Sequence, residues 1–168
     1  MFYYFKHSFL SGGTYIMKYS TKLSDAAHIL SYIHLNQLPS LSSTDIAVSI
    51  CTNPSYVRQI MSKLKSAGLI HSTRGQANPI LDREPEQITL LDIYRAVEGN
   101  KPLLHLDTNI NPECNVGVYI QYSLRDYYEE VQKVAENKMA QITLADILKT
   151  YDEKRQNSQT LSFFPKNI

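Results

Sequence analysis

The segment NPSYVRQIMSKLKSAGLI, residues 53–70, concentrates side chains that can hydrogen-bond to nucleic acid. Its apolar residues, from Val57 to Leu64, follow the i, i+3, i+4, i+7 spacing of a helix with one buried face. Polar side chains near a helix N-terminus can reach base edges, and cations can pair with phosphates. The outer face is polar with only positive charges, and together with the helix start it holds these candidate contacts: Asn53, Pro54, Ser55, Tyr56, Arg58, Gln59, Ser62 and Lys63.

Any surface helix is polar on its outer side, so this face alone fits a solvated helix equally well. The elements around it favour DNA binding. Asn53 and Pro54 are typical first residues of a helix, and Gly68 can end it in the left-handed conformation. Ser42 and Asp45 predict a short capped helix just before it, across a tight turn at 51–52. With a first helix at 21–36 and short strands at 69–70 and 80–81, the pattern predicts a winged helix-turn-helix, mainly α with a small β wing.

Two further groups of residues could contact the DNA backbone. One precedes the first helix, where side chains and the helix N-terminus can hold a phosphate. The other lies at the tip of the wing, where Pro79 stiffens the turn. The alternatives are a solvated chain segment and an ordinary polar turn. The candidate residues are Lys18, Tyr19, Ser20 and Lys22 before the helix, and Arg74, Gln76 and Asn78 in the wing.

The charge distribution supports two functions in one chain. The formal net charge is only +1, but Met17–Leu81 carries six Lys and Arg against two acids, whereas residues 82–168 carry ten against fourteen. A basic front half suits an anionic partner, and the acidic back half suits another task. The chain shows no Ser/His/Asp order, paired acids or phosphate-binding Gly loop, so we expect no enzyme.

The back half predicts a long helix suited to packing against another helix. A helix at 89–99, with Thr89 and Asp92 as its cap, leads through a loop at 100–115 to a helix at 116–141. Thr143 and Asp146 repeat the cap pattern and open a short final helix, and we expect residues 151–168 to form a flexible tail. Apolar residues of the long helix step by 4, 3, 4, 3, the seam of helix-on-helix packing. The expected dimerisation residues are Ile120, Leu124, Tyr127, Val131 and Val134.

The two cysteines are far apart and indicate a reducing, cytoplasmic environment. Cys114 precedes the long helix, where the helix N-terminus favours a reactive thiolate, so it is a candidate redox sensor. The alternative is a quiet packing residue, because Glu113 next to it opposes thiolate formation. Cys51 lies in the turn between helices, and we expect it in the core. The chain has no zinc spacing, and the histidines form no cluster with acids, so we expect no metal.

The first sixteen residues, MFYYFKHSFLSGGTYI, fit poorly with the rest and lack the features of a signal peptide. Gly12-Gly13 can be encoded as GGAGGU, a ribosome-binding sequence at a normal spacing from Met17. We therefore expect translation to begin at Met17, with residues 1–16 a non-native extension. The alternative is a genuine N-terminal arm, either disordered or packed on a dimer.

The motifs MKYSTKLSDAAHIL, YVRQIMSKLKSAGLI, EQITLLDIYRAVEG and MAQITLADIL together resemble the Rrf2 family of bacterial transcription regulators, from Met17 to about Tyr151. The resemblance implies a homodimer whose long helices cross and whose winged domains bind an imperfect palindrome. Family members that bind an iron–sulfur cluster carry three cysteines before the long helix. This chain has only Cys114 there, so it resembles the cluster-free branch, and no cofactor is expected.

The sequence thus predicts a dimeric, sequence-specific DNA-binding regulator that acts as a repressor, with Cys114 as a candidate thiol sensor of oxidants or electrophiles. One alternative is a regulator that responds to a ligand or metal, with the loop as a pocket wall. Another is a winged-helix module that binds protein and no DNA. The expected organisation is an extension at 1–16, a winged domain at 17–99, a loop at 100–115, the dimerisation and final helices at 116–150, and a tail at 151–168.

Overall fold

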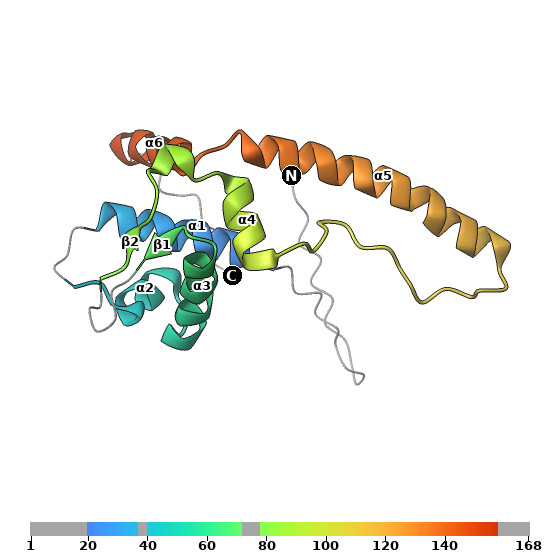
Figure 1. The fold of residues 1–168 in the computed structure, drawn as a ribbon, viewed down its shortest axis with the longest axis horizontal. Coiled ribbons are helices and arrows are strands. Elements are labelled where there is room, and N and C mark those ends of the chain that lie inside the picture. Colours follow the sequence, from blue (N-terminus) through green and yellow to red (C-terminus); the bar gives the residue numbers. More distant parts are fainter. Residues whose placement is uncertain (1–19, 37–39, 72–77, 158–168) are drawn as a thin grey trace.

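The computed structural model describes residues 20–36, 40–71 and 78–157, which form six α-helices, one 3-10 helix and two strands (Figure 1). Four predicted contact residues, Lys18, Tyr19, Arg74 and Gln76, lie outside the described residues, as do the proposed extension at 1–16 and the end of the proposed tail. The elements are α1 (Lys22–Leu35), α2 (Ser43–Ile50), α3 (Pro54–Ser66), β1 (Ile70–His71), β2 (Ile80–Leu81), η1 (Pro85–Gln87), α4 (Leu90–Glu98), α5 (Asn115–Ala140) and α6 (Leu144–Gln156).

The winged domain is held together by apolar residues at helical spacing. Val57, Ile60 and Leu64 of α3 are fully buried, as their periodicity predicts, and pack with residues of α1, α2 and α4. Burying each such side chain is worth about 1.5–3 kcal/mol, so this cluster fixes the orientation of α3. Strands β1 and β2 pair antiparallel, with Ile70 opposite Leu81. The mainly helical fold with a small β wing confirms the predicted class.

Local hydrogen bonds begin the helices where the sequence indicates. Ser42 and Asp45 form a reciprocal capping box at α2, and the Asn53 side chain accepts the Tyr56 backbone N–H at α3. The predicted end of α3 is confirmed as well, because Gly68, just after this helix, has the left-handed conformation with a φ of +66°. These caps satisfy backbone groups that a helix end leaves without intrahelical partners.

The starts of α4 and α6 lie side by side although more than fifty residues separate them. The Leu90 N–H donates to the Ile142 carbonyl at 2.8 Å, and the Leu144 N–H donates to the Ile88 carbonyl at 2.8 Å. The two similar segments ITLLDIY and ITLADIL therefore form a short antiparallel bridge, centred on Thr89 and Thr143. This bridge and the buried Leu144 fix α6 on the winged domain.

Helix α5 projects away from the winged domain, with the connecting loop running beside it (Figure 1). None of its residues is buried within the chain. Helix α6 continues through Tyr151 to Gln156, so part of the segment expected to be a flexible tail is helical. Among the described residues, no helix combines the length and the apolar character needed to cross a membrane.

Candidate nucleic-acid interface

Helix α3 presents three kinds of surface because successive residues are about 100° apart around its axis. The buried stripe holds it to the core. Opposite this stripe lie Ser55, Gln59 and Ser62, which are all exposed. Tyr56 and Lys63 lie on one flank of this outer face, and Arg58 lies on the other. The helix therefore offers a short polar surface between two flanks that each carry a basic side chain.

Arg58 is held in place by two hydroxyl groups. Its Nη1 donates to Ser43 Oγ at 3.1 Å, and its Nη2 donates to Ser55 Oγ at 3.0 Å. A guanidinium carries five N–H donors, so these contacts orient it and leave capacity for an anion or a base edge. Arg58, Ser62 and Asn78 line a cleft of about 410 Å³ between α2, α3 and the base of the wing. Ser43 was not among the predicted residues, because its proximity to Arg58 depends on how α2 packs.

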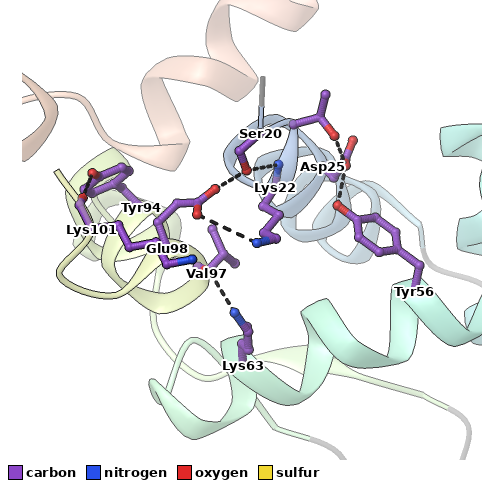
Figure 2. A network of polar contacts seen from close by, with 10 residues as sticks. Ser20, Lys22, Asp25, Tyr56, Lys63, Tyr94, Val97, Glu98 and Lys101 are labelled. Atoms are coloured by element: carbon purple, nitrogen blue, oxygen red, sulfur yellow. Dashed lines mark hydrogen bonds and ion pairs between the residues drawn. The ribbon is translucent and has the colours of Figure 1, made fainter. Parts of the chain in front are cut away.

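The other flank of α3 differs from the predicted outer face, because two of its side chains turn inward (Figure 2). The Tyr56 hydroxyl donates to Asp25 Oδ2 at 2.7 Å, and partial burial together with this carboxylate raises the pKa of the phenol. Lys63 Nζ donates to the Val97 carbonyl at 2.8 Å. Both side chains thus tie α3 to neighbouring helices in this structure.

The start of α1 lies beside the same flank. Ser20 Oγ donates to the Glu98 carboxylate at the end of α4, and Lys22 Nζ lies 3.9 Å from Glu98 Oε2. Ser20, Lys22, Asn53 and Tyr56 line a second cleft, of about 670 Å³. The predicted contacts that the structure describes lie on and around α3. Seven of them line the two clefts on either side of its outer face, and the others, Pro54, Ser55, Gln59 and Lys63, line neither cleft. Glu98 and Val97 were missed, because sequence spacing does not show which residues meet across the fold.

The two cysteines lie in different surroundings from one another. The prediction that Cys51 belongs to the core is wrong: it is exposed and ends α2 with a φ of 55°. The tight turn into α3 requires this left-handed conformation and directs the side chain outward. Cys114 is also exposed and occupies the N-cap position of α5, without a side-chain capping bond.

The residues present do not fit a cysteine-ligated iron–sulfur cluster. Cys51 belongs to the winged domain, whereas Cys114 begins α5 at the end remote from that domain (Figure 1). Over residues 20–36, 40–71 and 78–157, no three His, Cys, Asp or Glu side chains gather as metal ligands.

A short helix, a tight turn, a second helix with an exposed polar face and a two-stranded wing define a winged helix-turn-helix transcription regulator that binds DNA. Comparison with known proteins agrees. Residues 19–150 match the family model of Rrf2, described as an iron-dependent transcriptional regulator, and the chain belongs to this family.

Individual relatives support the assignment. A Bacillus subtilis (strain 168) protein named as a candidate HTH-type transcriptional regulator, YwnA, is 39% identical over 129 residues, covering 77% of this chain and 96% of its own. The crystal structure of a candidate DNA-binding protein is 37% identical with a TM-score of 0.62, covering 76% of this chain and 98% of its own. T. potens IscR is 29% identical with a TM-score of 0.57, covering 85% and 94%. The Rrf2 family and the relative YwnA are described as transcription regulators rather than enzymes.

Proposed function

We propose that the chain acts in the cytoplasm as a homodimer that binds a palindromic operator and represses transcription. The observation that carries the proposal is the surface of α5, a helix of 26 residues with none buried within the chain. Four of its five predicted seam residues are large exposed apolar side chains: Ile120 (53%), Tyr127 (67%), Val131 (49%) and Val134 (63%). An apolar stripe of this length is stabilised when a second copy covers it.

A dimer of this kind would present two α3 helices to one duplex. Two-fold symmetry places such helices in successive major grooves, about 34 Å or 10 base pairs apart. Ser55, Gln59 and Ser62 would face base edges, while Arg58 would reach a base or a phosphate. Phosphate contacts would make the affinity fall steeply with salt.

Genome-wide mapping of bound DNA followed by hydroxyl-radical footprinting tests this proposal. We expect a protected palindrome with two equivalent patches on the same face of the duplex, about one helical turn apart. In vitro transcription from the mapped promoter should fall when the protein is added. A single asymmetric footprint would contradict the dimer, and increased transcription would contradict repression.

We further propose that Cys114 senses oxidants or electrophiles. Its thiol is exposed at the N-cap position of α5 and makes no side-chain capping bond, so oxidants and electrophiles can reach it. Oxidation at this position would alter the junction between the loop and α5. This change would in turn alter the spacing of the two α3 helices in the dimer.

The second cysteine provides a matched control. In a gel-shift titration, hydrogen peroxide should weaken operator binding by the wild type and by Cys51→Ser, but not by Cys114→Ser. All three proteins should bind equally when reduced. If Cys114→Ser still responds to peroxide, the thiol proposal is wrong. A thermal shift with a small ligand or metal, and none with oxidants, would favour the alternative regulator.

A further inference from the structure

In the free chain, three side chains predicted to contact DNA converge on the C-terminal end of α4 (Figure 2). Ser20 Oγ donates to the Glu98 carboxylate, Lys22 Nζ lies 3.9 Å from it, and Lys63 Nζ donates to the Val97 carbonyl at 2.8 Å. One hydroxyl group just before α1, one ammonium group at the start of α1 and one on α3 therefore share one negatively polarised partner. We call this partner, Val97 and Glu98, the α4 terminus.

The α4 terminus is an unfavourable place for an acidic residue by local rules. The C-terminal end of a helix carries partial negative charge, so a carboxylate there is destabilising on its own. The Glu98 side chain is also only 12% exposed, which removes part of its hydration. Contacts with Ser20 and Lys22 must offset both costs. Glu98 therefore holds these two groups more firmly than a solvated glutamate would.

A DNA phosphate would use the same donors. Hydroxyl and ammonium groups are common phosphate ligands in protein–DNA complexes, and carboxylate and phosphate oxygens accept the same charge-assisted hydrogen bonds. Ser20 and Lys22 also line the cleft of about 670 Å³ beside the start of α3. A phosphate entering this cleft would meet donors that Glu98 already engages.

We propose that Glu98 is a built-in competitor of the DNA backbone: its carboxylate occupies Ser20 and Lys22 in the free protein and is displaced by a phosphate. The inference rests on the proposed DNA-binding function and adds an element that limits affinity. Because Glu98 opposes phosphate binding, the free protein binds duplex DNA more weakly than its cations alone would allow.

The position of the α4 terminus connects this competition to the dimerisation helix. Arg95 of α4 forms an ion pair with Glu136 of α5 at 2.9 Å, and the Tyr94 hydroxyl donates to the Lys101 carbonyl in the connecting loop. Gly99, with a φ of +69°, turns the chain directly after Glu98. A movement of α5 or of the loop would thus shift the carboxylate relative to Ser20 and Lys22.

The first test removes the negative charge of the Glu98 side chain and keeps the shape of that side chain. Glu98→Gln and Glu153→Gln change the net charge equally, but Glu153 lies on α6, on the opposite side of α1 from α2 and α3 (Figure 1). Binding to a mixed-sequence 30-base-pair duplex is measured by fluorescence anisotropy across a salt series. Glu98→Gln should bind roughly 2- to 5-fold more tightly, with a salt slope steeper by about 1. Glu153→Gln should match the wild type.

The second test asks whether Glu98 acts through Lys22. Lys22→Ala should weaken duplex binding more in the Glu98→Gln background than in the wild type, because the lysine is then available to phosphate. Equal losses in both backgrounds would overturn the competition, as would weaker binding and a shallower slope for Glu98→Gln. If the wild type shows no salt-dependent binding at all, the proposed function fails first and this inference fails with it.

Discussion

At the residue scale, the candidate interface depends on how each side chain is oriented before DNA arrives. Arg58 is oriented by Ser43 and Ser55, whereas Lys63 is directed to the Val97 carbonyl. A charged side chain that is already oriented on the outer face loses little conformational entropy on binding DNA, whereas one bonded to a partner within the chain must first break that bond. Arg58 is therefore the side chain on α3 whose loss should matter most.

Arg58→Ala should lower operator affinity by about 5- to 150-fold, because a bidentate base contact or a charge-assisted phosphate contact is worth about 1–3 kcal/mol. Anisotropy titrations against the operator and a scrambled duplex separate the two roles. Loss on the operator alone indicates base recognition, whereas equal loss on both with a shallower salt slope indicates a phosphate. Arg155→Ala on α6 is the matched control and should bind normally. Unchanged binding by Arg58→Ala would exclude it from the interface.

At the element scale, the helix starts show what sequence alone can predict. The capping boxes that begin α2, α4 and α6, at Ser42, Thr89 and Thr143, each join residues three apart. All three form as predicted. Such bonds depend on the local backbone, so spacing is enough to find them. The Ser20–Glu98 and Tyr56–Asp25 contacts join residues 78 and 31 apart. They depend on how α1, α3 and α4 pack, which no local pattern specifies, and the second contact turns Tyr56 away from the outer face on which periodicity placed it.

The capping box of α6 predicts a pH-dependent stability. The Thr143 backbone N–H and then its hydroxyl hold the pKa of Asp146 below its ordinary value of 3.8. The stabilisation is complete above that ordinary value and is lost as pH falls through the lower pKa of the folded state. Asp146→Asn should therefore melt a few degrees below the wild type at pH 7.

Thermal denaturation followed by circular dichroism at pH 7 and pH 3 checks this expectation. The gap between Asp146→Asn and the wild type should narrow at pH 3, which lies below 3.8, because the unfolded chain then takes up a proton that the capped carboxylate of the folded chain binds less readily. Asp152→Asn, a change of the same kind later on α6, should show a smaller gap at pH 7 because Asp152 does not cap the helix. A gap for Asp146→Asn that stays constant with pH would show that the carboxylate charge is not what stabilises α6.

At the scale of the whole molecule, one chain alone leaves the apolar side of α5 exposed. The connecting loop and α4 contact one side of the helix, where the Leu103 N–H donates to Gln132 Oε1 at 2.8 Å and Arg95 pairs with Glu136. Counting about 100° per residue, the predicted seam lies on a different side, centred near Ile120 and Val131. The contacts within the chain and the proposed contacts between chains can therefore exist together. The winged domain supplies its own core, so it should remain folded when the seam is disrupted.

Val131→Lys tests this arrangement by placing a charge in the middle of the seam, and Asn137→Lys places the same charge on another side of α5. In sedimentation equilibrium, the wild type and Asn137→Lys should show the mass of two 19.2 kDa chains, whereas Val131→Lys should shift toward one. Circular dichroism should show a folded protein in each case. Because a monomer contacts only one half-site, Val131→Lys should also bind the operator at least about 10-fold more weakly, as expected when two linked sites become one. A wild-type monomer would contradict the proposed dimer, whereas a Val131→Lys dimer with normal operator binding would place the dimer interface elsewhere than on the α5 seam.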